Sequence, residues 1–398
     1  MDPIAIGLED VQQAAERIAG RVLRTPMLPC HAISQLTGAD VFLKLDNLQV
    51  TGAFKERGAA NRLALLSAAE QARGVIAMSA GNHAQAVARH ASLLGVAATI
   101  VMPKFTPSTK VTRTAAWGAT VLLVGETLAE AAAHAHELAA AQSLVFIHPY
   151  DDLAIIAGQG TLALEMLRDV PDLDALIIPV GGGGLLAGCL VAATALHPGI
   201  AVYGAEVETY AAMAQRLAGR PVSVGGATIA EGIAVRDIGE IPFEMVRRRI
   251  AGILVAPERA IEEAIGLLAE GAKTVAEGAG AAGVAALLTY PERFRGKKVG
   301  VAITGGNIDA RILSNVLLRD GRLLRLHLQI PDRPGVLADI AGKIGDSGGN
   351  IIEVSHQRLF ASSSVQAAEL EVMVEARDKA HANAIIEALE RSYIVRQV

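Results

Sequence analysis

The chain is short of cysteine, of aromatic residues and of clustered positive charge. Its two cysteines are Cys30 and Cys189, which excludes a disulfide framework and a metal motif built from paired cysteines. The formal net charge is −5 and no basic block stands out, so no nucleic-acid partner is predicted. Residues 1–4 show no basic segment leading into an apolar core, and the sequence therefore predicts a cytoplasmic protein without a signal peptide.

Charge is also missing from one long internal stretch. Residues 175–205 contain no Asp, Glu, Lys or Arg, a length that would suffice for a membrane span. Pro179, four consecutive glycines and the pair His197-Pro198 interrupt this stretch. Strand, loop, buried helix and strand is the better interpretation, and no membrane association is predicted.

What the sequence does contain is a regular alternation of short apolar, β-rich runs with helical patterns. A chain of 398 residues is expected to form two or three domains. The alternation predicts an α/β fold of parallel sheets covered by helices on both faces, with ligands beyond the carboxyl ends of the strands. Strands are expected at 41–45, 75–78, 98–102, 119–124, 144–147, 175–180, 202–205, 253–255 and 299–303, and helices starting near Asn82, Ser108, Leu128 and Leu153.

The pattern changes after about residue 320. Residues 323–330 alternate as a strand, and the next helix is expected to carry Pro334 in its first turn. Strands at 350–359 and 370–374, a helix at 378–390 and a strand at 393–396 complete a βαββαβ, ferredoxin-like order. We therefore predict one domain of residues 1–322, with a smaller lobe of roughly residues 50–150 inserted in it, and a second domain of residues 323–398.

Lys55 is the first candidate for chemistry. It lies in the segment Thr51–Gly58, shortly after the apolar run 41–45. A lysine amine can form an imine with an aldehyde cofactor, and a substrate amine can displace it. An exposed lysine at the start of a helix is the ordinary alternative, and only agreement with distant motifs favours the chemical interpretation.

A run of glycines forms the second motif. It follows the apolar run 176–180 and opens an apolar helix, so its backbone N–H groups can converge on one anion. A phosphate site is predicted at Gly181, Gly182, Gly183, Gly184 and Leu185.

The same run has a rival interpretation. Gly182-x-Gly184-x-x-Ala187 fits the dinucleotide-binding fingerprint, and Glu206 ends the next strand about 20 residues later. An NAD-dependent oxidoreductase is therefore the alternative from a different class of enzyme. That function would leave Lys55 without a role.

Two further loops follow strands and open helices. In the first, made of Ser79, Ala80, Gly81, Asn82 and His83, the N–H groups and the Ser79 hydroxyl suit a substrate carboxylate, and Asn82 suits a ring oxygen. The alternative is an ordinary helix cap by Ser79 or Asn82. The second loop, Thr304-Gly305-Gly306-Asn307, offers a hydroxyl in the same kind of position.

Together these motifs resemble the fold-type II pyridoxal-phosphate enzymes, specifically the threonine and serine dehydratases, over roughly residues 5–320. The tail resembles an ACT domain, an amino-acid-sensing module, through Asp332–Leu337 and Asn350-Ile351. The whole order resembles the threonine dehydratases (threonine ammonia-lyases) with a single ACT domain. Residues 1–322 are then the catalytic domain and residues 323–398 the regulatory domain.

The resemblance implies a role for each motif. Lys55 matches the lysine that attaches to pyridoxal 5'-phosphate, with Phe54 against the cofactor, and the glycine run matches its phosphate loop. Asn82 matches the partner of the ring oxygen, and Thr304 matches the hydroxyl facing the pyridine nitrogen. Lys55 and Ser79 are the expected catalytic residues, and the loop from Ser79 to His83 is the expected substrate site.

Three departures from the family pattern bear on specificity. Ala53 replaces a serine that often precedes the phenylalanine and lysine. Ala80 stands where serine racemases carry a second serine, so the far face of the substrate lacks a proton donor and elimination is favoured over racemisation. Glu206 matches one ligand of a divalent cation, but Ala212 stands near the place of a second carboxylate, and no metal is predicted.

The resemblance implies dehydration and deamination of L-threonine to 2-oxobutanoate and ammonia, with L-serine a poorer substrate. A serine or hydroxyaspartate dehydratase, or a racemase, of the same family is the alternative.

For residues 323–398, the resemblance implies allosteric regulation by a branched-chain amino acid in isoleucine biosynthesis. It also implies a homodimer or homotetramer. A purely structural oligomerisation module is the alternative. The expected effector residues are Arg333, Pro334, Gly335, Val336, Asn350 and Ile351.

Overall fold

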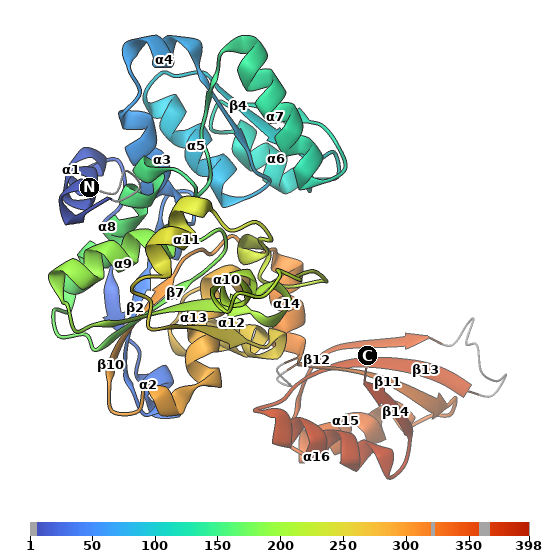
Figure 1. Cartoon of the computed structure of the whole chain (residues 1–398). Coiled ribbons are helices and arrows are strands. Elements are labelled where there is room, and N and C mark those ends of the chain that lie inside the picture. Colours follow the sequence, from blue (N-terminus) through green and yellow to red (C-terminus); the bar gives the residue numbers. More distant parts are fainter. Residues whose placement is uncertain (1–5, 320–322, 358–366, 398) are drawn as a thin grey trace. The chain divides into compact units, whose positions relative to one another are not determined.

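Two compact units make up the chain, residues 1–308 and residues 309–398 (Figure 1). The computed structural model describes residues 6–319, 323–357 and 367–397. The domain boundary predicted at Arg322 lies outside the described residues and stays a prediction. Among the described residues, no helix has the length and apolar character needed to cross a membrane.

The larger lobe of the first unit is built on a six-stranded sheet. Its order is β1-β2-β10-β7-β8-β9, and every neighbouring pair is parallel except β1 with β2. The central strand β7 is buried along its whole length, as expected for a parallel strand covered on both faces. The strands are β1 (Met27–Pro29), β2 (Asp40–Leu45), β7 (Ala175–Pro179), β8 (Ala201–Val207), β9 (Gly252–Ala256) and β10 (Lys298–Ile303).

Helices pack closely around this sheet. One very close contact joins α8 and α9, where a methyl group on Gly188 would lie 2.2 Å from the Ile156 carbonyl oxygen, so only glycine fits. The helices of this lobe are α1 (Leu8–Ile18), α2 (His31–Thr37), α8 (Leu153–Asp169), α9 (Gly184–Leu196), α10 (Ala212–Leu217), α11 (Glu240–Val246), α12 (Glu258–Gly271) and α13 (Gly278–Thr289).

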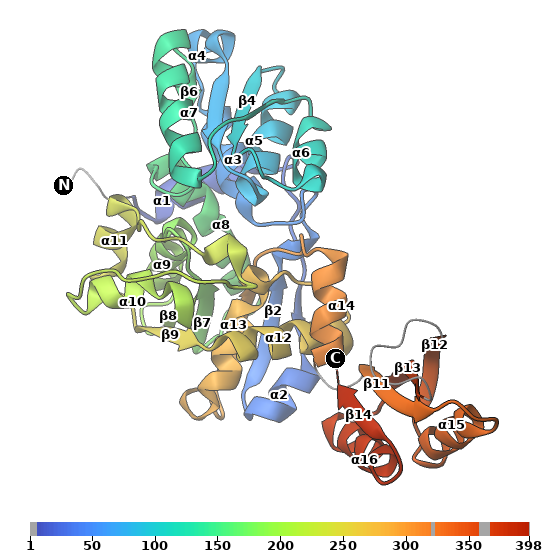
Figure 2. The same ribbon diagram turned by 90° about the vertical axis from the view of Figure 1, so that its right-hand side faces the viewer.

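The smaller lobe has its own parallel sheet, in the order β5-β4-β3-β6, and its own apolar core (Figures 1 and 2). Its strands are β3 (Val75–Met78), β4 (Ala98–Met102), β5 (Thr120–Leu123) and β6 (Val145–Phe146). The helices between residues 55 and 142 are α3 (Lys55–Ala64), α4 (Ala68–Arg73), α5 (Asn82–Leu93), α6 (Ser108–Ala115) and α7 (Leu128–Gln142).

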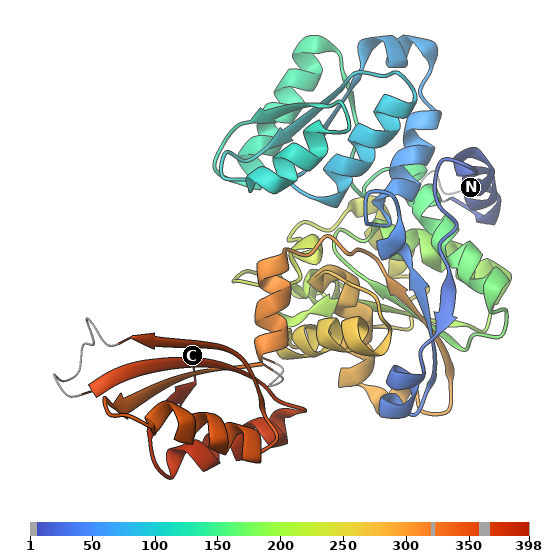
Figure 3. The ribbon, with the colours of Figure 1, turned by 180° about the vertical axis from the view of Figure 1, so that it is seen from behind.

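The second unit has the predicted βαββαβ order after an additional helix, α14 (Ala310–Arg319). Its antiparallel sheet runs β12-β13-β11-β14, and α15 and α16 cover one face of it (Figures 1 and 3). The elements are β11 (Leu323–Pro331), α15 (Val336–Asp346), β12 (Asn350–Gln357), β13 (Ala367–Glu375), α16 (Lys379–Glu390) and β14 (Ile394–Gln397).

The predicted fold class is therefore confirmed, with two local differences. Each strand expected between residues 41 and 303 is present, but the short antiparallel strand β1 was not foreseen. The placement of Pro334 in the first helical turn is wrong: α15 begins at Val336 with Gly335 as its N-cap, so Pro334 precedes the helix. The φ angle of Gly335 is +92°, which favours glycine at the cap.

Candidate active site

Lys55 is the first residue of α3. Its side chain is half-buried, and Nζ donates a hydrogen bond of 2.8 Å to the Pro149 carbonyl. Nζ also lies 5.2 Å from the centre of the Phe54 ring. Burial lowers the pKa of Lys55 from 10.5 to about 8. A substantial fraction of the amine is therefore neutral near physiological pH, as a nucleophile or base requires.

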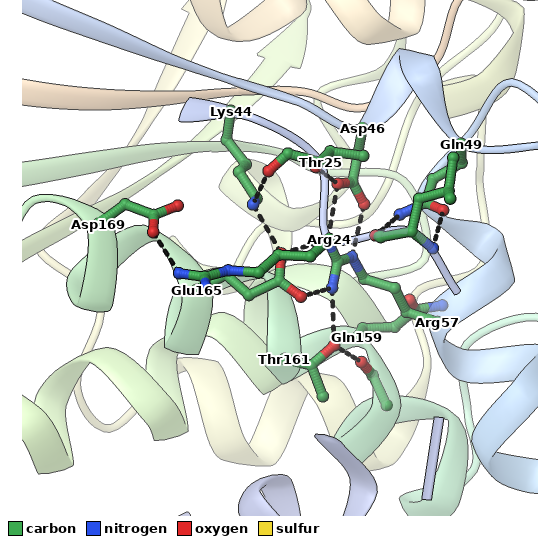
Figure 4. A network of polar contacts seen from close by, with 12 residues as sticks. Arg24, Thr25, Lys44, Asp46, Gln49, Arg57, Gln159, Thr161, Glu165 and Asp169 are labelled. Carbon is green, nitrogen blue, oxygen red and sulfur yellow. Dashed lines mark hydrogen bonds and ion pairs between the residues drawn. The ribbon is translucent and has the colours of Figure 1, made fainter. Parts of the chain in front are cut away.

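A buried network of charges holds the start of α3 in place (Figure 4). The Arg57 guanidinium donates to both carboxylate oxygens of Asp46, at 2.6 and 2.8 Å, and to both of Glu165, at 2.8 and 2.9 Å. Thr161 accepts a further bond at 3.1 Å, and Lys44 Nζ lies 2.6 Å from Glu165. Asp46 follows β2 and Glu165 belongs to α8, so the network ties α3 to both elements.

The loop after β10 lies against the loop that carries the lysine. The Phe54 N–H donates to the Thr304 carbonyl at 2.9 Å, and the Gly306 N–H donates to the Gly52 carbonyl at 2.9 Å. Thr304 is buried, with its hydroxyl 3.4 Å from the Ala279 carbonyl. Two motifs far apart in the sequence therefore meet at the carboxyl ends of neighbouring strands.

The loop from the smaller lobe joins β3 to α5. Gly81 is the N-cap of α5, and no side chain caps this helix, so the capping role considered for Ser79 and Asn82 is wrong. The Ser79 hydroxyl accepts a hydrogen bond of 3.2 Å from the Gly81 N–H. A methyl group on Gly81 would meet no heavy atom within 4 Å, so the loop borders open space beside Ala80 and Gly81. A small ligand has room here.

Asn82 reaches from the smaller lobe to the larger one. Its Nδ2 donates to Glu277 at 2.6 Å, and its Oδ1 accepts from Asn307 Nδ2 at 2.8 Å. Asn307 Nδ2 also donates to the Thr51 carbonyl at 2.7 Å. The lysine loop, the Asn82 loop and the loop after β10 are thus joined directly.

Glu277 is a residue of this site that the motif analysis missed. It precedes α13, and burial raises the pKa of its carboxyl group to about 7. A methyl group on Gly305 would lie 2.3 Å from Glu277 Oε1, so the glycine keeps room for this carboxyl group. Its one sequence signal is an acid directly before the small residues Gly278-Ala279-Gly280.

The glycine run forms the turn between β7 and α9, with Gly183 in a left-handed conformation. A methyl group on Gly182 would lie 2.3 Å from the Tyr150 ring, and one on Gly184 would lie 2.8 Å from the Tyr150 carbonyl oxygen. Leu185 is buried in the first turn of α9. The N–H groups of a first helical turn have no acceptor within the helix, so this turn can bind an anion.

The two histidines near the site are held by backbone groups. His83 Nε2 lies 3.0 Å from the Ile147 carbonyl oxygen, and burial together with the Lys55 charge lowers its pKa to about 3. His83 is therefore neutral and its Nε2 donates to that carbonyl. His148 Nδ1 accepts from the Asp151 N–H at 2.7 Å. Both contacts order the loop that contains Pro149, the acceptor of the lysine.

Glu206 is occupied by protein groups. Its side chain is 1% exposed, and its two oxygens accept the N–H groups of Met213 at 2.8 Å and Ala214 at 2.9 Å. It is thus turned toward α10 and is not free for a ribose hydroxyl, which removes a main support of the dinucleotide interpretation. Within the described residues, no group of three or more His, Cys, Asp or Glu side chains is arranged to hold a metal ion.

The residues that meet here fit pyridoxal phosphate. A half-buried lysine of lowered pKa suits its aldehyde. The first-turn N–H groups of α9, which have no acceptor within the helix, suit its phosphate. The buried Thr51 hydroxyl has no hydrogen-bond partner among the described residues, which leaves one polar group for a ligand. The donors and the nucleophile of the site therefore suit this cofactor.

The loop predicted to bind an effector follows β11. Arg333, Pro334 and Gly335 are exposed and Val336 is buried. The strand register separates this loop from the other predicted effector residues. Pro331 pairs with Ala367 at one end of β13, whereas Asn350 pairs with Glu375 at the other end.

Eight residue intervals of about 3.4 Å place these ends roughly 27 Å apart, with Ile351 beside Asn350. One domain therefore does not bring the two groups together.

Comparisons with known proteins agree with this geometry. The model of the pyridoxal-phosphate dependent enzyme family matches residues 18–305, and that of the ACT domain matches residues 325–392. An L-threonine ammonia-lyase of Thermotoga maritima is 40% identical, over 98% of this chain and 98% of its own.

Solved structures resemble the chain as well. The processed form of threonine deaminase isoform 2 from Solanum lycopersicum shares 33% identity at a TM-score of 0.74, covering 78% of this chain and 86% of that one. Serine racemase from Dictyostelium discoideum shares 36% identity at a TM-score of 0.72, covering 76% and 99%. The chain thus belongs to the pyridoxal-phosphate-dependent enzymes and carries a C-terminal ACT domain.

Proposed function

We propose that the protein is an L-threonine ammonia-lyase, which converts L-threonine to 2-oxobutanoate and ammonia and acts less well on L-serine. The observation that carries the proposal is Lys55, a half-buried amine of lowered pKa at the meeting point of three loops. The names of the relatives, L-threonine ammonia-lyase and threonine deaminase, support the same reaction.

Each loop then has a task in holding the cofactor. The first-turn N–H groups from Gly181 to Leu185 would bind its phosphate. Phe54 would lie against its ring, Asn82 would bond the ring oxygen, and Thr304 would face the ring nitrogen. When bound, pyridoxal phosphate supplies an aldehyde that takes the substrate amine and a ring that accepts electron density from Cα.

Lys55 is the base in this proposal. Its neutral amine removes the proton from the substrate Cα, and the Pro149 carbonyl keeps the amine directed into the site. The β-hydroxyl group takes up one proton, which balances the one that Lys55 removes from Cα, and leaves as water. The released enamine hydrolyses in water to 2-oxobutanoate and ammonia, so one water is lost and one is gained.

The Ser79 loop is proposed to hold the substrate carboxylate. The Ser79 oxygen accepts the Gly81 N–H, and its own hydrogen stays available for donation. The open space beside Gly81 gives the carboxylate room. Ala80 offers no proton to the far face of the substrate, which favours elimination over racemisation.

The second unit is proposed to bind isoleucine or valine and to regulate the enzyme. The Arg333 N–H donates to the Pro331 carbonyl, and Pro334 has no N–H, so the free donors at this loop are those of Gly335 and the first turn of α15. Because Asn350 lies at the other end of the sheet, a complete pocket would join the loop of one copy to the β12 start of a second copy. This geometry supports a homodimer or homotetramer.

Calorimetry with isoleucine and valine tests the regulatory proposal. Binding that shifts the affinity for threonine is expected, since coupling between two sites is reciprocal. No heat and no rate change with either amino acid would leave oligomerisation as the role of this unit.

Lys55→Ala tests the catalytic proposal. We expect turnover to fall by several orders of magnitude with the fold intact, because the covalent attachment and the base are lost together. Lys104→Ala, at an exposed lysine on the loop after β4, is the matched control. Formation of 2-oxo acid from threonine, serine and hydroxyaspartate measures both activity and preference, and a Lys55→Ala enzyme keeping a tenth of the turnover would refute the assignment.

A further inference from the structure

Four residues form a chain of hydrogen bonds that crosses between the lobes. The Thr51 carbonyl accepts from Asn307 Nδ2, and Asn82 Oδ1 accepts from the same nitrogen. Asn82 Nδ2 then donates to Glu277 Oε1 at 2.6 Å. Glu277 and Asn307 of the larger lobe therefore bind the nitrogen and the oxygen of the Asn82 amide, respectively.

The chemistry at the ends of this chain sets its direction. A backbone carbonyl can only accept, so the Asn307 side chain must turn its nitrogen toward Thr51. Both hydrogens of that nitrogen are then used, one on Thr51 and one on Asn82 Oδ1. If Asn82 were flipped, two amide nitrogens would face each other, and its oxygen would face the Glu277 carboxylate.

We propose that Glu277 and Asn307 are positioning residues that orient Asn82 so that one of its N–H groups is left to donate to the ring oxygen of the cofactor. The Asn82 amide nitrogen has two hydrogens, and Glu277 takes one. The oxygen end is already engaged by Asn307. Because the oxygen faces Asn307 and the nitrogen keeps one hydrogen, the nitrogen side of the amide offers a donor to a ligand. The inference rests on the proposed role of Asn82.

Close packing around Glu277 fixes the position of its carboxyl group. Methyl groups on Gly305 and Gly280 would lie 2.3 Å from Glu277 Oε1 and 2.2 Å from the Gly305 carbonyl, respectively. Neither glycine can gain a side chain without moving the carboxyl group or the loop. The glycines therefore leave the space beside Asn82 that the Glu277 carboxyl group occupies.

The charges near Glu277 give the site a pH response. Burial raises the pKa of Glu277 to about 7, and Lys110 of α6 and Glu231 of the large lobe act on it in opposite senses. Lys110 and Glu231 form an ion pair of 2.8 Å with each other. As the pH rises through about 7, Glu277 ionises and becomes a stronger acceptor for the Asn82 N–H. The Asn82 orientation is therefore held most firmly above neutrality.

The test measures the absorption spectrum of the bound cofactor and its dissociation constant, neither of which requires turnover. Glu277→Ala and Asn307→Asp are each expected to shift the spectrum toward the form with a protonated ring oxygen. Each is also expected to weaken cofactor binding about 10-fold to 100-fold, the loss of one hydrogen bond to a charged group. Glu277→Gln keeps an accepting oxygen without the charge. Its spectrum should lie between those of the wild type and Glu277→Ala, and it should lose the spectral change near pH 7.

Glu231→Gln is the matched control, because it removes a nearby acid that is paired with Lys110. Its spectrum above neutrality should stay that of the wild type, and only the pH midpoint of the spectral change should fall, because the Glu231 charge raises the pKa of Glu277. A spectral shift as large as that of Glu277→Ala would overturn the proposal in favour of a general charge effect. Asn82→Ala separates the two levels of the argument. If it leaves the spectrum unchanged, the proposed role of Asn82 fails. If it shifts the spectrum while Glu277→Ala and Asn307→Asp do not, the role stands and the positioning inference fails.

Discussion

Replacing Arg57 by alanine should destabilise the first unit more than any loss of surface charge. Arg57 is fully buried and its guanidinium makes five hydrogen bonds, four of them to the carboxylates of Asp46 and Glu165. The variant leaves Asp46, which is also fully buried, without its main counter-charge. Removing one partner of a buried ion pair costs about 3–5 kcal/mol of unfolding free energy.

The cost translates into a measurable melting shift. An unfolding entropy of about 2 cal/mol/K per residue over the 308 residues of this unit amounts to about 0.6 kcal/mol/K. The Arg57→Ala variant should therefore melt about 5–8 °C below the wild type. Arg24, drawn beside it in Figure 4, supplies the control: its ion pair with Asp169 has a side-chain exposure of 63% on the arginine. Arg24→Ala should cost at most about 1 kcal/mol.

Circular dichroism melts of five proteins decide the matter: the wild type, Arg57→Ala, Asp46→Ala, the double variant Arg57→Ala/Asp46→Ala and the control Arg24→Ala. The double variant should lose less than the sum of Arg57→Ala and Asp46→Ala, because removing both partners leaves fewer unpaired buried charges. An Arg57→Ala melt no lower than that of Arg24→Ala would refute the reasoning. Strict additivity in the double variant would show that the two side chains act independently.

Three further outcomes are expected. In the apoenzyme the rate of cofactor attachment should rise with pH to a plateau, with a midpoint near 8, because the lowered pKa of Lys55 makes the neutral amine abundant there. Stopped-flow absorbance measures this rate, and a midpoint near 10 would contradict the lowered pKa. Gly182→Ala should weaken cofactor binding about 10-fold or more, since its methyl group would collide with the Tyr150 ring, whereas Gly342→Ala, whose methyl group meets nothing, should not; titration of the apoenzymes compares them. Ala80→Ser should form D-serine from L-serine by supplying a proton donor to the far face, and chiral chromatography without a D-isomer would show that this residue alone does not set the outcome.

Much of the fold could be predicted because buried parallel strands leave a plain signal in the sequence. β7 is a continuous apolar run, and so is β10 after its first residue, Lys298. The runs end at a glycine and a threonine turn, and the helices from Asn82 and Leu153 begin where expected. The strand β1 is different: it has three residues, ends in Pro29 and lies half-exposed at an edge. Such a segment has no apolar run to detect, and only its pairing with β2 makes it a strand.

The motifs of the site could be found locally, but their supports could not. Asn82 and Glu277 are 195 residues apart, and nothing near either residue in the sequence indicates the other. The sequence alone would place Arg57 on the surface of a helix. In the structure it is buried because α8 lies over it and supplies Glu165 as its partner. The role of each of these side chains depends on which loops meet at the ends of the sheet. The residues next to it in the sequence do not show which loops these are.

The glycine run illustrates why a motif can be correct for more than one reason. Gly182 and Gly184 are required by the contact with Tyr150 whether or not a phosphate binds, since a methyl group on either would enter its van der Waals radius. Tyr150 in turn donates from its hydroxyl to the Asp237 carbonyl at 2.8 Å, and it follows Pro149, which accepts from Lys55. The same close packing therefore orders the turn that exposes N–H groups and the carbonyl that directs the amine. Glycine is thus needed at the same positions for packing against Tyr150 and for binding a phosphate. Because one set of contacts serves both purposes, the glycine turn and the Pro149 carbonyl are held in place together.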